Sequence, residues 1–196
     1  MSTLAALTLF KVINMKILIL TDSLKQGGAE THVELLCSHL QKLGVDISVA
    51  SAGGAVAKRM KRAGIKQIYL PPYDVHWQKE GESPLSPTVS FGVSCDVLKR
   101  IVRREQPDII HAHTRKTALL AHIVCKREKI PLITTAHAMF SMITPLNFLP
   151  WGDGTIAVSE DIRDHIITKS LFPPTNIKII NNGVLIEEET QNQNIM

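Results

Sequence analysis

The order of hydrophobic and polar positions along the chain predicts an α/β fold. Ile17 to Leu20 form an uninterrupted apolar run, which is typical of a strand covered on both faces of a parallel sheet. From Ala29 onward, apolar residues recur every three or four positions, as they do along one face of a helix. Gly44 stands where a left-handed residue ends a helix, and residues 46–50 form a second strand. This pattern is a βαβ unit, whose crossover we expect to be right-handed.

The same alternation continues through the chain. Two more helices are predicted over residues 56–63 and 91–105, and two others after Thr114 and Ser159, whose hydroxyls suit helix N-caps. Five more strands are predicted at residues 67–70, 108–113, 132–137, 155–159 and 177–180. Alternation of this kind predicts a Rossmann-like, doubly wound parallel sheet in a single domain. We place an N-terminal extension at residues 1–14, the domain at 15–184 and a polar tail at 185–196.

Ligands of doubly wound sheets bind at the carboxyl ends of the strands, so the residues there are the candidates for function. The first is the loop that ends in Gly27 and Gly28, where a phosphate could approach the start of the next helix without meeting a side chain. The alternative is that the two glycines only form a turn. The chain lacks both G-x-G-x-x-G and G-x-x-x-x-G-K-[ST], which argues against a nicotinamide enzyme or a P-loop enzyme.

Three histidines come next. The sequence H-A-H in a strand places His111 and His113 on the same face, since side chains alternate along a strand. As metal ligands they would need further partners, and only Asp108 is close in sequence. We therefore expect no metal and interpret His111 as a structural residue. His137 ends a later strand, and we expect it to bind a hydroxyl or a phosphate rather than to transfer a proton.

Composition limits the other possibilities. The chain is 44% hydrophobic but only 5% aromatic, so its core must be aliphatic, and its formal net charge of +4 is mildly basic. Basic residues gather in helices, where they can be solvated faces or can attract anionic lipid headgroups. They are Lys58, Arg59, Lys61, Arg62, Lys99, Arg100, Arg103, Arg104, Arg115, Lys116, Lys126, Arg127 and Lys129. Nucleic acid is not expected as a partner, because aromatic residues are not interleaved with these charges.

Cysteine usage and the N-terminus bear on location. Cys37, Cys95 and Cys125 are widely separated and form no C-x-x-C, which argues against a disulfide framework or a zinc site and favours the cytoplasm. The apolar stretch within residues 1–14 is too short to span a bilayer, although it could touch a membrane surface. The sequence shows neither G-x-S-x-G nor paired carboxylates at strand ends, so no complete catalytic set is visible.

Five segments together resemble the N-terminal domain of the family 4 glycosyltransferases. The first is G-G-A-E-x-H after an apolar strand, and the others follow in the same order as in the family. They are residues 107–113 (PDIIHAH), 131–137 (PLITTAH), 157–160 (AVSE) and 178–184 (KIINNGV). Each is weak alone, but five in order are specific, and the match runs from about residue 15 to residue 184.

The resemblance implies a GT-B architecture, in which two Rossmann-like domains enclose the active site. Such enzymes transfer a sugar from a nucleotide-sugar donor to an acceptor with retention of configuration, without a metal or another cofactor. It implies that Gly27 and Gly28 approach the donor diphosphate and that His137 contacts the transferred sugar. His113, Thr114 and Arg115 would line the side of the acceptor, a glycan or a lipid-linked sugar. Members that sit on membranes do so through basic surfaces, which implies a peripheral position on the inner face.

The sequence departs from the family in one respect. It stops about where the second domain would begin, and that domain supplies most nucleotide contacts and the E-x7-E motif in the family. We therefore expect the chain to fold but to be inactive alone. The alternatives are a non-catalytic binding module or subunit that pairs with a separate C-terminal half, and a flavodoxin-like or other nucleotide-binding protein.

Overall fold

The computed structural model describes residues 14–73, 91–139 and 151–183 of the 196-residue chain. The predicted N-terminal extension, apart from Asn14, and the predicted polar tail therefore lie outside the described residues.

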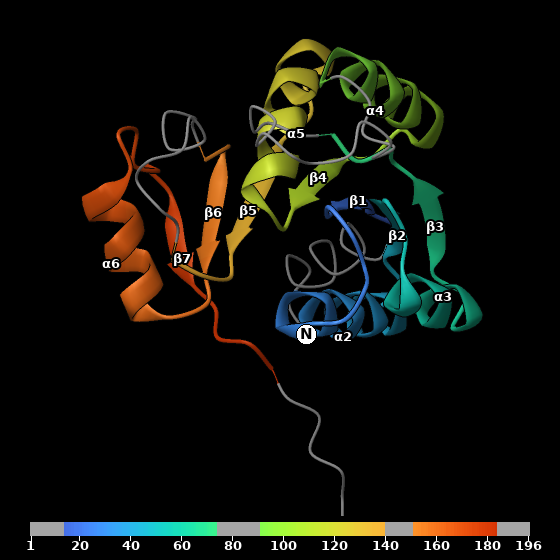
Figure 1. Ribbon diagram of the computed structural model, residues 1–196, viewed down its shortest axis with the longest axis horizontal. Coiled ribbons are helices and arrows are strands. Elements are labelled where there is room, and N and C mark those ends of the chain that lie inside the picture. Colours follow the sequence, from blue (N-terminus) through green and yellow to red (C-terminus); the bar gives the residue numbers. More distant parts are fainter. Residues whose placement is uncertain (1–13, 74–90, 140–150, 184–196) are drawn as a thin grey trace, which may run out of the picture.

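Within the described ranges, seven parallel strands form one sheet in the order β3-β2-β1-β4-β5-β6-β7 (Figure 1). Their bounds are β1 Lys16–Leu20, β2 Asp46–Ser51, β3 Lys66–Tyr69, β4 Ile109–Ala112, β5 Leu132–Ala136, β6 Gly154–Ala157 and β7 Ile177–Ile179. The order confirms the predicted Rossmann-like sheet. Successive strands run outward from β1 in one direction and then from β4 in the other, so the topological switch point lies between these two strands.

Helices cover both faces of this sheet. They are α2 Gly28–Lys42, α3 Ala55–Arg62, α4 Phe91–Glu105, α5 Arg115–Glu128 and α6 Glu160–Lys169. Figure 1 shows α2 and α3 along one face, α4 and α5 along the other, and α6 beside β6 and β7. In the described part of the chain, no helix combines the length and the apolar character needed to cross a bilayer.

Two layers of core explain the apolar run of β1. Leu18 and Leu20 are fully buried on the face packed by α4 and α5, whereas Ile19 is fully buried on the face packed by α2 and α3. Because successive side chains point to opposite faces, a strand covered on both faces needs apolar residues at every position. Each such side chain contributes about 1.5–3 kcal/mol relative to an exposed one.

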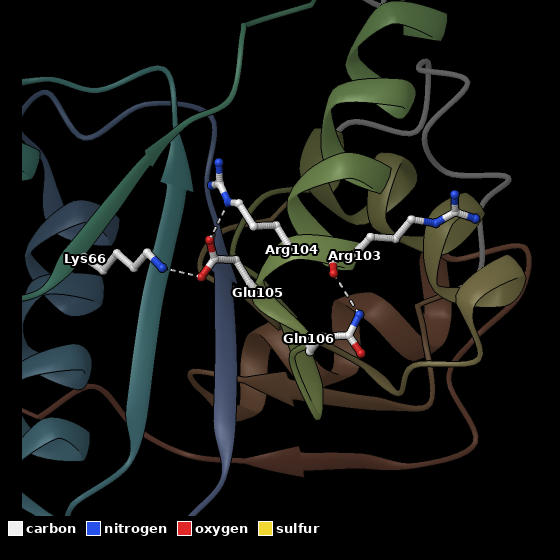
Figure 2. Close-up of polar contacts among 5 residues, drawn as sticks. All are labelled: Lys66, Arg103, Arg104, Glu105 and Gln106. Atoms are coloured by element: carbon white, nitrogen blue, oxygen red, sulfur yellow. Dashed lines mark hydrogen bonds and ion pairs between the residues drawn. The ribbon is translucent and has the colours of Figure 1, made fainter.

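Charged side chains connect β3 to α4 at the edge of the sheet where the strands begin, which we call the amino edge (Figure 2). Glu105, the last residue of α4, accepts hydrogen bonds from Lys66 Nζ at 2.5 Å and from Arg104 Nε at 2.8 Å. The next residue, Gln106, has a φ of 51° and donates from its side chain to the Arg103 carbonyl at 2.8 Å. These contacts tie the edge strand β3 to α4 at the side of the sheet opposite to the predicted site.

Candidate functional site

The loop after β1 is fixed against the loop after β2. Leu24 N–H donates to the Gly53 carbonyl at 2.9 Å, and Val56 N–H donates to the Leu24 carbonyl at 2.9 Å. Gly54 has a φ of 143°, and a Cβ added there would lie 2.2 Å from the Leu24 carbonyl oxygen. A side chain at residue 54 is therefore excluded by backbone, which explains why the chain needs a glycine there.

Gly27 and Gly28 form the uncapped start of α2. Gly27 is extended, with a φ of 169°, and the helix that follows it has no side-chain cap. A Cβ at Gly27 would meet only the flexible end of Glu30, at 2.5 Å, and one at Gly28 would meet nothing within 4 Å. Both glycines are exposed. The first N–H groups of α2 are thus reachable by an anion, and the fold itself does not require Gly28.

Three histidine rings meet at the carboxyl edge of the sheet. The structure ends β4 and β5 one residue earlier than predicted, so His113 and His137 directly follow these strands, and His32 lies near the start of α2. His113 Nδ1 and His137 Nε2 are 3.0 Å apart and share a hydrogen bond. The ring of His32 lies 4.9 Å from that of His137 and 5.7 Å from that of His113, measured between centroids.

His111 supports this group from within the sheet. Its Nε2 lies 2.7 Å from Thr135 Oγ1, and its ring is 4.2 Å from that of His113. It is buried and satisfied, as expected for a structural residue. Burial, and then the neighbouring rings, lower the pKa of His111 and of His137 to about 4 each. The same causes hold the pKa of His113 well below its usual value, so these rings are neutral near pH 7.

Sequence reasoning missed His32. It lies within the G-G-A-E-x-H segment, but nothing in the local pattern shows that this face of α2 meets the ends of β4 and β5. Only the sheet order brings residues 32, 113 and 137 together, because it places β1 next to β4 and β4 next to β5. The signal that could have identified His32 is the G-G-A-E-x-H motif, of which only the glycines were considered as site residues.

Thr114 joins the site to α5. Its Oγ1 accepts a hydrogen bond from Thr117 N–H at 3.1 Å, which confirms the predicted N-cap. The same hydroxyl donates to Asp22 Oδ1 at 3.0 Å, across the switch point between β1 and β4. Burial raises the pKa of Asp22, although the Thr114 hydrogen bond and the charge of Lys116 act against that shift. Asp22 is a second site residue that sequence reasoning did not select.

Arg115 was grouped with the basic residues of helix surfaces, but its side chain is largely buried. Its guanidinium is stacked over the ring of Trp151, 3.9 Å from the centroid, and burial lowers its pKa to about 10. The Trp151 indole N–H in turn donates to Ser170 Oγ at 2.9 Å. The planar cation is held by an aromatic face, a contact that a charge count along the sequence cannot reveal.

Other basic residues are engaged by carboxylates. Arg59 pairs with Glu34 at 2.6 Å, and Arg103 pairs with Glu128 at 3.0 Å. These pairs link neighbouring helices on the surface, where each contributes at most about 1 kcal/mol. They reduce the positive charge that the helical basic residues offer to an outside partner.

Enclosed space at the site is small. A cavity of about 30 Å³ lies among Thr21, Asp22, Tyr73 and Lys116, and the Tyr73 hydroxyl donates to the Lys116 carbonyl. Two larger hollows, of about 460 and 850 Å³, lie beside α5 with β5 and beside β3 with α4. None of these three spaces is lined by the histidines of the site.

Comparisons with known proteins agree with this architecture. A family model described as Glycosyltransferase Family 4 matches residues 26–188. Among solved structures, a glycosyltransferase from Rickettsia africae is 19% identical with a TM-score of 0.64, covering 87% of this chain and 44% of that one. Anabaena HepE in complex with UDP-glucose is 21% identical with a TM-score of 0.65, covering 87% and 44%. The lipopolysaccharide outer core galactosyltransferase WaaB is 16% identical with a TM-score of 0.60, covering 88% and 47%.

These likenesses fix the fold and the extent of the match. At such identities the solved structures show the fold alone, and the chain spans less than half the length of each. No relative was found among proteins of curated function.

Proposed function

Because the chain belongs to Glycosyltransferase Family 4, we propose that it is the N-terminal half of a retaining enzyme that transfers a sugar from a nucleotide-sugar donor to an acceptor. One observation carries this proposal. The uncapped, side-chain-free start of α2 lies beside histidine rings at the topological switch point, where ligands of doubly wound sheets bind. An anion-accepting helix end next to neutral hydrogen-bonding rings suits a ligand that carries both phosphates and hydroxyls.

In this proposal the donor diphosphate approaches Gly27 and Gly28. The exposed N–H groups and the positive end of the α2 dipole favour negative charge there. His137 then contacts a hydroxyl of the transferred sugar through Nδ1, the ring nitrogen that its hydrogen bond with His113 leaves available. Transfer proceeds without a metal or other cofactor, because helix N–H groups and the opposite domain's cations stabilise the leaving diphosphate.

The acceptor, a glycan or a lipid-linked sugar, lies on the side of His113, Thr114 and Arg115. Thr114 holds the Asp22 carboxylate at this edge, which supplies a strong hydrogen-bond acceptor for an incoming hydroxyl. On this side of the site, Arg115 stacks its guanidinium over the ring of Trp151. The enzyme works in the cytoplasm, on the inner face of the membrane, where helical basic residues outside the surface ion pairs face anionic lipid.

Half a site does not catalyse transfer at a useful rate. Removing a single donor of charge stabilisation costs roughly 10²–10³ in rate, so losing the whole opposite wall should abolish turnover. The 196-residue chain is therefore inactive by itself and binds nucleotide sugars weakly. The alternative proposal is a non-catalytic module or subunit that pairs with a separate C-terminal half.

A titration of the isotopically labelled chain with nucleotide sugars, followed by amide NMR, tests the proposal. Shift changes should concentrate at Gly27, Gly28 and His137, with weak, fast-exchanging binding. Changes centred on the hollow between β3 and α4 would contradict it. So would tight binding of flavin or NAD, which would instead support a nucleotide-binding protein of another class.

A further inference from the structure

His32, His113 and His137 each offer a ring nitrogen, and these nitrogens lie within 4.8 Å of one another. We propose that this histidine trio binds one divalent transition-metal ion of the Zn²⁺ class. In a tetrahedral site with Zn–N bonds of about 2.0–2.1 Å, two ligand nitrogens lie about 3.3 Å apart. His113 Nδ1 and His137 Nε2 are already 3.0 Å apart. His32 is half-buried near the start of α2, and its ligand nitrogen lies within 4.8 Å of the other two.

A cation that replaces the proton shared by His113 and His137 would change which ring nitrogens carry protons. Two neutral rings can place only one proton between them, so one outer nitrogen keeps a proton and the other keeps a lone pair. Neither outer nitrogen, His113 Nε2 or His137 Nδ1, has a hydrogen-bond partner among the described residues, and both are buried. A metal between the rings would take both inner lone pairs, and the proton that had been shared would move to the outer nitrogen that lacked one, so both outer nitrogens would be N–H groups.

The ligand set selects the kind of metal. Neutral imidazoles suit Zn²⁺, Co²⁺ and Ni²⁺, whereas Mg²⁺ and Ca²⁺ require oxygen ligands. The trio contains no carboxylate or thiolate. Three protein ligands leave a fourth position for water or for an oxygen of a bound molecule, as in catalytic zinc sites.

The sequence argued against a metal because too few ligands lay close to H-A-H, and the structure removes that objection. H-A-H lacked a partner close in sequence, and the fold supplies His32 from α2. The inference does not rest on the proposed sugar transfer, which needs no metal. A metal held here would be a property of this chain in either case, and it would occupy nitrogens that a sugar hydroxyl otherwise contacts.

Cobalt binding tests the inference directly. The untagged 196-residue chain, stripped with chelator, is titrated with Co²⁺ while visible absorption is recorded. We expect one Co²⁺ per chain, in a tetrahedral spectrum that Zn²⁺ abolishes by displacement. Loss of an outer-shell partner alone weakens metal binding roughly 10- to 100-fold, so His32→Gln, which removes a direct ligand, should weaken it by more than about 100-fold.

His39→Gln is the matched control. His39 lies on the same helix, is exposed, and contacts the Leu35 carbonyl rather than the trio. This variant should bind Co²⁺ as the wild type does, and circular dichroism should show both variants folded. Absence of one-to-one binding would overturn the inference, as would wild-type affinity in His32→Gln or an equal loss in His39→Gln. The NMR titration with nucleotide sugars is read separately, so either proposal can fail without the other.

Discussion

The positions of the histidine side chains at the site are determined by three elements, β4, β5 and α2, that meet there. His113 and His137 each follow the last residue of a strand, and His32 reaches the same edge from α2. The H-A-H pattern and the Pro-to-His strand were sufficient to predict two of these rings at one edge. His32 and Asp22 could not be predicted, because their importance depends on contacts with residues about 90 positions away in the sequence.

The half-buried Asp22 carboxyl should make the fold less stable as pH rises. Its pKa is raised in the folded chain, so the folded state holds this proton more tightly than the unfolded state. Stability is therefore lost as pH rises from the ordinary carboxyl pKa through the raised one. Asp22→Asn keeps an acceptor for Thr114 and removes the charge, so it should raise the free energy of unfolding at pH 7 by about 1 kcal/mol or less.

Urea denaturation of Asp22→Asn at several pH values measures this effect. The gain should vanish in acid, where the wild-type carboxyl is neutral as well. Asp108→Asn is the control, because that carboxylate accepts from the Lys16 N–H at an exposed position. A gain that is equal at all pH values, or that also appears in Asp108→Asn, would show that burial of charge at Asp22 is not the cause.

At the scale of elements, helix starts carry the chemistry. α5 begins at a side-chain cap, Thr114, whereas α2 begins at a bare glycine pair. Ser159 caps α6 in the ordinary way, its Oγ accepting from Ile162 N–H at 3.3 Å. The caps at Thr114 and Ser159 were predicted from the sequence, since hydroxyl residues before a helical pattern have that local role. The contact of Thr114 with Asp22 was not, because it joins two strands.

Thr114→Ala should therefore destabilise the fold more than Ser159→Ala. Losing a cap costs about 1 kcal/mol, and Thr114 also leaves a buried carboxylate without its donor. Thr114→Ser keeps the hydroxyl and should restore most of the difference. Chemical denaturation of the three variants measures the order, and equal losses in Thr114→Ala and Ser159→Ala would show that the Asp22 contact does not contribute.

The contacts of Glu105 with Lys66 and Arg104 should make the fold more stable as pH rises, which is the opposite of the effect of Asp22. Burial by itself would raise the pKa of Glu105, but hydrogen bonds and charge from Lys66 and Arg104 outweigh it and lower the pKa. Its stabilisation is complete above the ordinary carboxyl pKa and is lost as pH falls through the lowered one. Glu105→Gln should cost about 1 kcal/mol at pH 7 and little in acid. Thermal unfolding at pH 7 and in acid measures this, and an equal loss at both would contradict it.

For the whole molecule, the alternation of short apolar runs with helical patterns predicted every strand within two residues. The strand order could not be read in this way, since hydrophobic runs do not identify their neighbours. Arg115 shows the same limit. Its charge predicted a position on the surface, whereas the fold stacks its guanidinium on the ring of Trp151. The N-terminal extension, apart from Asn14, and the polar tail lie outside the described ranges and stay predictions.

The purified chain by itself should show no sugar transfer. Radiolabelled nucleotide sugars offered with lipid-linked and glycan acceptors should remain unconsumed, because the wall that would face Gly28 and His137 is not provided by this chain's described residues. A measurable rate above the uncatalysed control would contradict the proposal that the site needs an opposite domain.

The most direct measurement of the central claim compares two glycine-to-alanine variants. A Cβ meets nothing within 4 Å at Gly28 or at Gly92, and both glycines lie in helices, so each substitution should leave the fold intact and stabilise it by about 0.4–1 kcal/mol. Only Gly28 lies at the helix start where the donor diphosphate is proposed to bind. In the amide NMR titration with nucleotide sugars, Gly28→Ala should abolish the shift changes and Gly92→Ala should leave them unchanged. Equal responses from the two variants would contradict the account.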